Sequence, residues 1–277
     1  MRKTNNSTRS IARRLFVAAS GVAVAASLAV ASPAAAETNT VKPTVVFVHG
    51  AWTDASSFTD VEKILTKDGY PTLDFANPLR SLSADAAYLA TFLATRTEGP
   101  VILVGHSYGG AVVSAAALSD PDVKSLVYVD AFVPAEGESL LDLLFGAGPV
   151  DPTQLFDTVP YPNAPDGDVD LYLKKDAFDA GFANGLKPAQ ASSFYSQQRP
   201  ITLGAVNEKA PAGEAWKTLP SSYVAGTQDG SIPIALQLEM AERAGSTVTQ
   251  VEAGHLSMVK EPKTVARVIE EAAGNTK

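Results

Sequence analysis

The sequence predicts an α/β fold in which a mostly parallel central sheet carries helices on both faces. Short apolar runs rich in β-branched residues alternate with amphipathic segments along most of the chain, which is typical of strands joined by helices. The first run, at 44–48, has no polar side chain after Thr44 until His49. Such an uninterrupted run indicates a strand buried on both faces, as in a parallel sheet.

The elements before residue 131 follow one another in strand and helix order. Strands are expected at 44–48, 70–76, 101–105 and 124–130, and helices at 56–69, 83–96 and 110–118. The first helix has serine caps at its start and Gly69 at its end, and its apolar residues recur at helical spacing. The same order resumes late in the chain, with strands at 221–226 and 247–254 and helices at 233–245 and 263–273.

The alternation fails between about residues 134 and 220. This segment is rich in Pro, Gly and Asp and shows no clear strand, and it includes an expected exposed loop at 160–168. Because the α/β pattern continues after it, we interpret 37–277 as one domain with an inserted cap at about 134–220. Several aromatic residues of the cap, Phe182 and Trp216 among them, are candidates for lining a gated, apolar pocket.

Residues 1–36 have the layout of a secretory signal peptide. A basic segment with five Lys or Arg and no acid leads into an alanine-rich apolar stretch, and Ala34-Ala35-Ala36 provides a small-residue cleavage site. Arg13-Arg14 also resembles the pair of a twin-arginine signal. The apolar stretch is short and is interrupted by serine and glycine, so a cleaved signal and a secreted protein are favoured over a retained membrane anchor.

Charge and composition exclude several classes of partner and site. Cleavage after Ala36 would leave 17 basic against 30 acidic residues, and such an acidic surface repels phosphate backbones, so no nucleic-acid partner is expected. The chain has no cysteine, which excludes disulfides, thiolate metal sites and a cysteine nucleophile. We expect a small-molecule substrate and no stable membrane anchor.

The stretch "GHSYGG" at 105–110 places Ser107 between a predicted strand and a predicted helix. A turn this tight needs neighbours with almost no side chain, which Gly105 and Gly109 provide. The turn would present the serine hydroxyl above the sheet edge, where the amides of the helix N-terminus favour developing negative charge. We therefore interpret Ser107 as a nucleophile; a glycine-rich turn, such as a phosphate-binding loop that lacks its lysine, is the alternative.

A serine nucleophile needs a base, and the chain has three histidines. His106 adjoins the serine and should point away from it, and His49 more plausibly orders the loop that follows the first strand. His255 comes directly after the last predicted strand, at the carboxyl edge of the sheet where ligands bind in such folds. His255 is therefore the predicted base.

The base in turn needs a carboxylate that fixes its tautomer. Asp229 follows the strand at 221–226 and is favoured, in the chain order Ser107, Asp229, His255. Asp130, after the strand at 124–130, is the rival candidate. The amides of Tyr108 and Ala51 are predicted to form the oxyanion hole, and Trp52 either shapes the pocket or packs in the core. No metal or organic cofactor is expected.

With "VFVHGAW", "VGHSYGG", "AGTQDG" and "GHLSMVKEP" in this order, the chain resembles the α/β-hydrolase superfamily, and within it the branch of plant methylesterases, hydroxynitrile lyases and related bacterial esterases. The resemblance implies a threonine in the lyases where this chain has Gly50, and a lysine where it has Leu256. Ester hydrolysis is therefore favoured over carbon–carbon cleavage. The prediction is a secreted serine esterase; a hydroxynitrile lyase-like enzyme and a non-catalytic binding protein remain alternatives.

Overall fold

The computed structural model describes residues 42–146, 152–165 and 167–274. The predicted signal peptide at 1–36 lies outside the described residues. Within the described ranges, no helix combines the length and apolarity needed to cross a membrane.

The central sheet has six parallel strands in the order β2-β1-β3-β4-β8-β9. Its strands are β1 Thr44–Val48, β2 Thr72–Phe75, β3 Val101–His106, β4 Val123–Val129, β8 Ser221–Gly226 and β9 Thr247–Val251. The central strands β1, β3, β4 and β8 are almost wholly buried, as their uninterrupted apolar runs predict. The predicted α/β fold with a parallel central sheet is confirmed.

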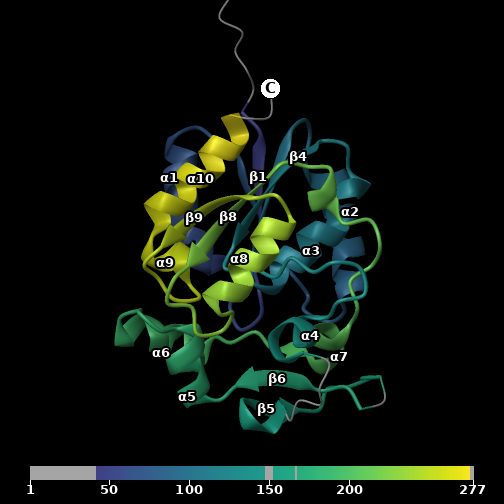
Figure 1. Cartoon of the computed structure of the whole chain (residues 1–277), viewed down its shortest axis with the longest axis vertical. Helices are drawn as coiled ribbons and strands as arrows, with labels where there is room; N and C mark the ends of the chain where they lie inside the picture. Colours follow the sequence, from purple (N-terminus) through teal and green to yellow (C-terminus); the bar gives the residue numbers. More distant parts are fainter. Residues whose placement is uncertain (1–41, 147–151, 166, 275–277) are drawn as a thin grey trace, which may run out of the picture. The chain divides into compact units, whose positions relative to one another are not determined.

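Helices cover both faces of this sheet (Figure 1). The helices of the domain body are α1 Thr59–Lys67, α2 Leu82–Arg96, α3 Tyr108–Ala116, α8 Ile234–Arg243, α9 Ser257–Lys260 and α10 Pro262–Gly274, with short η1 Ala55–Phe58 and η2 Ala117–Ser119. Buried residues of α1 and α10 belong to one core cluster, and those of α2, α3 and α8 to the other. Each face therefore has its own core.

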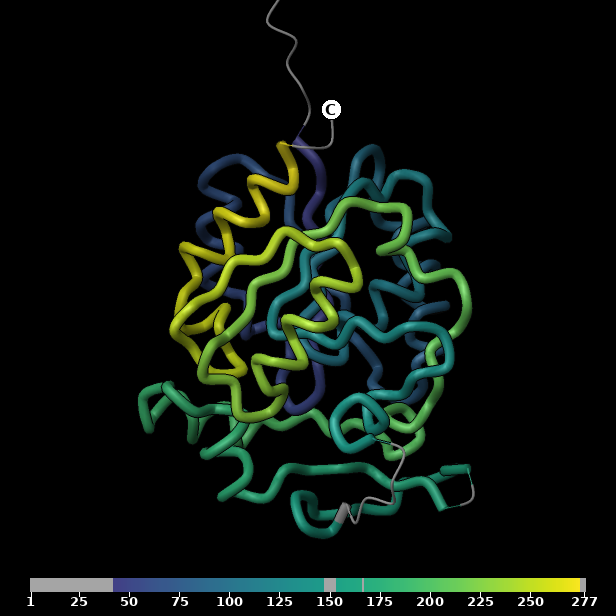
Figure 2. Tube along the Cα trace, viewed as in Figure 1, coloured from purple at the N-terminus to yellow at the C-terminus, as the bar shows by residue number. Residues whose placement is uncertain are grey.

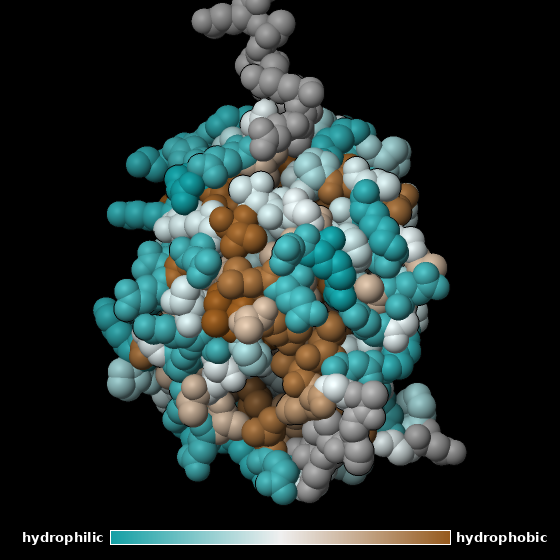
Figure 3. All heavy atoms as spheres, viewed as in Figure 1, coloured by the Kyte–Doolittle hydropathy of each residue, from teal (hydrophilic) through white to brown (hydrophobic). Residues whose placement is uncertain are grey.

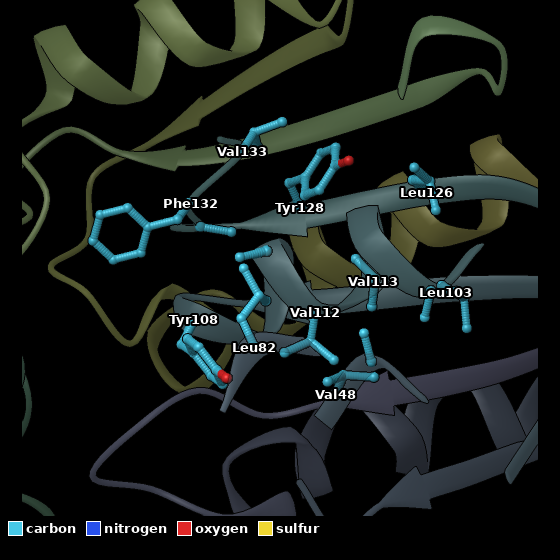
Figure 4. Packing of buried hydrophobic residues seen from close by; sticks show 14 of the residues in the cluster. Val48, Leu82, Leu103, Tyr108, Val112, Val113, Leu126, Tyr128, Phe132 and Val133 are labelled. Carbon is cyan, nitrogen blue, oxygen red and sulfur yellow. The ribbon is translucent and has the colours of Figure 1, made fainter. Parts of the chain in front are cut away.

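Alternating side chains of the strands supply the two cores. Val46 and Val48 of β1 belong to the cluster with α3, whereas Val45 and Phe47 belong to the cluster with α1 and α10, because successive side chains of a strand point to opposite faces. Figure 4 shows Val48 and other strand residues next to Val112 and Val113 of α3. Burial on both faces holds the strand ends, and the loops that follow them, in fixed positions.

The segment between β4 and β8 contains a second, smaller sheet in the order β5-β6-β7, whose strands are antiparallel. Its elements are α4 Leu140–Phe145, η3 Pro152–Gln154, β5 Phe156–Val159, β6 Asp170–Leu173, α5 Lys175–Ala177, the π-helical η4 Phe178–Phe182, α6 Pro188–Ser196, β7 Ile201–Thr202, α7 Leu203–Asn207 and η5 Ala215–Lys217. The expectation of no strand here is wrong: the strands are two to four residues long, too short for a recognisable pattern. We call this segment the cap; its boundaries at about 134 and 220 stay a prediction.

The cap segment runs past the carboxyl ends of the central strands (Figures 1 and 2). Trp52, in the loop after β1, connects it to the sheet. Its amide donates to the carbonyl of Arg199 at 2.8 Å, and its indole N–H donates to the carbonyl of Leu171 at 2.9 Å. These two bonds fix the cap next to the loop that also contains Ala51.

Candidate active site

Ser107 lies at the sharp turn between β3 and α3 and is 3% exposed. Its backbone has φ 52° and ψ −124°, a conformation that is costly for a residue with a side chain. The turn is held by its own carbonyl, which accepts hydrogen bonds from Gly110 N at 2.9 Å and Phe132 N at 3.1 Å. The surrounding hydrogen bonds therefore maintain the strained position of the serine.

Close backbone packing explains the glycines on either side of Ser107. A Cβ on Gly105 would lie 2.7 Å from the carbonyl oxygen of Gly109, and a Cβ on Gly109 would lie 2.1 Å from that of Val48. These contacts are too short for any side chain. Gly105 and Gly109 thus allow the strand, the turn and the helix to pack against one another, as the sequence predicts.

His255 and Asp229 form a buried hydrogen-bonded pair. Nδ1 of His255 lies 2.8 Å from Oδ2 of Asp229, and both side chains are almost completely buried. A carboxylate can only accept, so Nδ1 carries the proton and Nε2 has its lone pair free. Among the described residues, Nε2 of His255 has no hydrogen-bond partner, so it is available to accept a proton.

Asp229 accepts three further hydrogen bonds that fix its carboxylate. Oδ1 accepts from the amides of Ser231 at 2.7 Å and Ile232 at 2.9 Å, and Oδ2 also accepts from the side chain of Gln237 at 2.8 Å. Gln237 was not predicted from the sequence. Its signal is a polar residue on the apolar face of α8, at helical spacing from the buried Met240 and Ala241.

The charges around His255 favour its protonated form. Burial alone would lower the pKa of His255, but the carboxylates of Asp229 and Asp130 outweigh it, and the pKa is raised above its ordinary 6.5. The site can therefore hold an imidazolium without exposing it to water.

Asp130, the rival acid, lies at the end of β4 and is completely buried. Its oxygens accept from two backbone amides, those of Gly226 at 2.8 Å and Ser257 at 3.0 Å. The His255 ring donates its Nδ1–H to Asp229 instead. The geometry thus agrees with the preference for Asp229 as the partner of His255.

The other two histidines are bonded within the protein interior. Nδ1 of His49 bonds the carbonyl of Gly50 at 2.9 Å, its Nε2 accepts from Asn77 N at 3.2 Å, and burial lowers the pKa of His49 to about 4. Nε2 of His106 donates to the carbonyl of His255 at 3.0 Å, and burial keeps the pKa of His106 well below 6.5. Both are held neutral in positions that order neighbouring loops.

The amides of Ala51 and Tyr108 are the predicted donors of an oxyanion hole. Both residues line the same cavity as Ser107 and His255. The backbone hydrogen bonds of the described loops include neither of these two N–H groups, whereas the next amide, that of Trp52, is bonded to Arg199. The hydroxyl of Tyr108 donates to the buried carboxylate of Asp85 at 2.8 Å, which anchors this residue to α2.

A cavity of about 320 Å³ opens onto these groups. Its walls combine loops of the sheet with α4, β5, β6 and neighbouring parts of the cap, and they are almost wholly apolar: Trp52, Phe132, Leu140, Leu141, Leu144, Phe145, Leu155, Phe156, Leu173, Ile201, Val206 and Ile232 contribute. No Lys, Arg, Asp or Glu is among the described residues that line it. In Figure 3 apolar residues form a band that extends toward the lower end of the molecule, where Figure 1 shows the cap.

The three aromatic residues predicted to shape the pocket have different positions. Trp52 lines the cavity, with its ring 5.4 Å from that of Phe156. Phe182 is not a lining residue; it lies behind the wall, with its ring 5.2 Å from that of His255. Trp216 packs in the core with its indole N–H toward the carbonyl of Pro134, away from the cavity, so its predicted pocket role is corrected to a packing role.

Gly50 and Leu256 are the two positions at which this chain differs from the lyase pattern. Neither position can provide what the lyase side chain would provide there. A Cβ on Gly50 would lie 2.6 Å from Cβ of Ser107, so a larger residue here would displace the nucleophile. Leu256 is 2% exposed and packs in the core cluster with α10, where it offers no charge to a leaving group.

Comparison with known proteins agrees with this fold. The alpha/beta hydrolase family matches residues 45–268. The chain is 37% identical over 123 residues to a carbendazim hydrolyzing esterase of Nocardioides sp., a match that covers 40% of this chain and only about half (51%) of that esterase. It is 26% identical over 253 residues to a pyrethroid hydrolase of Sphingobium wenxiniae, which covers 83% of this chain and 87% of that protein.

Among solved structures, polyneuridine aldehyde esterase superposes with a TM-score of 0.70 at 19% sequence identity, over 83% of this chain and 98% of that one. At this identity the similarity shows a shared fold. A parallel sheet with a serine at a tight strand-to-helix turn and a buried Asp–His pair near the same sheet edge defines the class of α/β hydrolases. The chain belongs to the alpha/beta hydrolase family. Its relatives with named activities are hydrolases and esterases, which supports the prediction of a carboxylic ester hydrolase.

Proposed function

We propose that the chain is a serine esterase that hydrolyses neutral, largely apolar carboxylic esters through an acyl-enzyme. The observation that carries this function is one cavity with Ser107 and His255 in its wall, where Asp229 fixes His255 so that its Nε2 is free. The absence of charged side chains among the described lining residues favours a neutral substrate.

In the proposed mechanism, Oγ of Ser107 attacks the ester carbonyl while Nε2 of His255 takes its proton. Asp229 keeps the ring in the correct tautomer and stabilises the imidazolium. The amides of Ala51 and Tyr108 donate to the oxyanion of the tetrahedral intermediate. His255 then returns the proton to the leaving alkoxide, and the alcohol departs. Water next attacks the acyl-serine while His255 takes its proton, and His255 returns that proton to Oγ of Ser107 as the carboxylic acid leaves.

The first test is hydrolysis of p-nitrophenyl esters from acetate to palmitate by the chain from Glu37 onward, together with labelling by a fluorophosphonate. We expect turnover and stoichiometric labelling, both lost in Ser107→Ala. Release of cyanide from mandelonitrile without ester turnover would instead support a lyase. Absence of both turnover and labelling would mean that the scaffold only binds its ligand.

The pH dependence of kcat/KM is expected to follow His255. The base must be neutral to accept the serine proton, and the surrounding carboxylates raise the pKa of His255 above 6.5. Activity should therefore fall as the pH decreases, with the midpoint of the acid limb above 6.5. A pH–rate profile of the unmodified enzyme measures this midpoint; a limb centred near pH 5 would contradict the charge arrangement.

Removal of the Phe156 ring is expected to shift chain-length preference. Phe156 lines the cavity and stacks on Trp52, so Phe156→Ala should enlarge the cavity and raise the ratio of kcat/KM for octanoate over acetate by about tenfold. The matched control is Phe92→Ala, which removes a phenylalanine of α2 that does not line the cavity. An equal change of the ratio in both variants would assign the effect to general loosening.

Export through the 1–36 segment is part of the proposed function. Its basic start, apolar middle and alanine-rich end support a cleaved signal, and Arg13-Arg14 supports the twin-arginine route. N-terminal sequencing of protein from the culture medium should give a chain that starts at Glu37. A mature protein that still starts at Met1 would contradict export by this signal.

A further inference from the structure

Asp130 is a buried carboxylate for which the proposed mechanism has no use. It is fully inaccessible to solvent, and its backbone has φ 45°, in the left-handed region that costs energy for residues other than glycine. Burial of an ionisable side chain is also unfavourable unless the group is well bonded. Asp130 therefore carries two energetic costs, a strained backbone and a buried carboxylate. Because it lies directly beside the site, these costs indicate a role in the site.

The hydrogen bonds of Asp130 connect the two loops that carry the other site residues. Oδ1 accepts from Gly226, three residues before Asp229, and Oδ2 accepts from Ser257, two residues after His255. A Cβ on Gly226 would lie 3.0 Å from Oδ1 of Asp130 and 2.8 Å from two carbonyl oxygens of the His255 loop. Because residue 226 is glycine, the end of β8 can pack directly against the His255 loop and the Asp130 carboxylate.

We propose that Asp130 is a positioning residue of this site: its carboxylate holds the loops of Asp229 and His255 in register and adds a second negative charge beside the His255 imidazolium. The role depends on the proposed function, because a fixed and charge-stabilised His255 matters for catalysis only if His255 acts as the base. One carboxylate with two acceptor oxygens is suited to this, since each oxygen takes one backbone N–H from a different loop.

The titratable groups around the pair are few. His255 has the carboxylates of Asp229 and Asp130 near it, and the neutral ring of His106 has its centroid 4.8 Å away. Asp130 also has near it Tyr223, whose hydroxyl donates to the carbonyl of Ala131. Burial and the neighbouring Asp229 raise the pKa of Asp130 to about 7, whereas the charge of a protonated His255 favours the ionised form of Asp130.

The test is an NMR titration of histidine ring nitrogens in the Ser107→Ala protein, with and without Asp130→Asn. The pKa of both His49 and His106 is lowered, so His255 alone should titrate near neutral pH. Loss of the Asp130 charge should lower the His255 midpoint by about half a pH unit or more. In the protein with Ser107 intact, Asp130→Asn should move the acid limb of kcat/KM in the same direction and lower kcat about tenfold or more, with little change of KM.

Glu214→Gln is the matched control. Glu214 is another buried carboxylate that accepts a backbone amide, that of Glu136 at 3.0 Å, and it is not among the groups that act on His255. This variant should leave the His255 midpoint unchanged. An unchanged midpoint in Asp130→Asn, or an equal shift in Glu214→Gln, would overturn the charge role of Asp130.

Ser257→Pro tests the positioning role if Asp130→Asn does not fold. Ser257 is the first residue of α9, where proline is tolerated, and the change deletes the N–H that Asp130 accepts. We expect a lower kcat with a retained His255 midpoint; an unchanged kcat would overturn the positioning role. The NMR titration needs no turnover, so failure of the esterase assay would reject the proposed function separately from the role of Asp130.

Discussion

Replacement of Ser107 by alanine is expected to lower kcat for p-nitrophenyl esters by about 10⁶-fold. The alanine removes the hydroxyl oxygen that is proposed to form the covalent bond, whereas the cavity, the Asp229–His255 pair and the predicted oxyanion amides stay in place. Residual activity about 10³-fold above the uncatalysed rate should remain from binding and the oxyanion hole. Steady-state kinetics and fluorophosphonate labelling measure both parts of the effect.

The control for this variant is Ser114→Ala. Ser114 is another buried serine, within α3, but its hydroxyl bonds Gly110 O and the Tyr128 hydroxyl, and it does not line the cavity. It should lose about 1 kcal/mol of unfolding free energy and keep its kcat within a factor of about 3. If Ser107→Ala keeps more than a few per cent of the activity, Ser107 is not the nucleophile.

Asp229→Asn is expected to lower kcat by about 10⁴-fold while the fold is retained. The asparagine oxygen can still accept from the Ser231 and Ile232 amides, but its NH₂ group would face Nδ1 of His255. The ring would then favour the tautomer with the proton on Nε2, which cannot accept the serine proton. Loss of the carboxylate should also lower the pKa of His255, so the residual activity should extend to lower pH.

A small effect of Asp229→Asn would have a specific meaning. If this variant retains more than about a tenth of its activity and Asp130→Asn does not, Asp130 is the acid that supports His255. Combination of both substitutions in a double-mutant cycle then measures the coupling between the two carboxylates. Melting temperatures of all three proteins separate loss of chemistry from loss of fold.

The main sheet could be predicted because its signals are local. The strands at 44–48 and 221–226 have the bounds expected from their apolar runs, and the turn at Ser107 is marked by glycines that the close backbone contacts require. The cap could not be predicted in this way. Its strand β7 has two residues, and it pairs with β6, about thirty residues earlier in the chain, so no short window of sequence contains the pattern.

The same contrast holds for the site. Ser107, Asp229 and His255 each follow a predicted strand, so sequence order and the shared sheet edge bring them together. The contacts of Asp130 depend on distant packing, because its partners Gly226 and Ser257 are 96 and 127 residues later in the chain. Gln237 is only eight residues from Asp229, but its bond to that carboxylate requires the turn between them to fold back. Trp216 shows the converse error, because an aromatic residue in an insertion has the same sequence signal whether it lines a cavity or fills the core.

The division of the cavity walls between two parts of the chain has a consequence for evolution. The groups proposed to react belong to loops of the sheet, whereas α4, β5 and β6 provide much of the apolar wall. Mutations in these cap elements can therefore alter which molecules fit the cavity without changing the proposed catalytic residues. A protein family built this way can change its substrate range through mutations in the cap, while selection preserves the loops of the sheet.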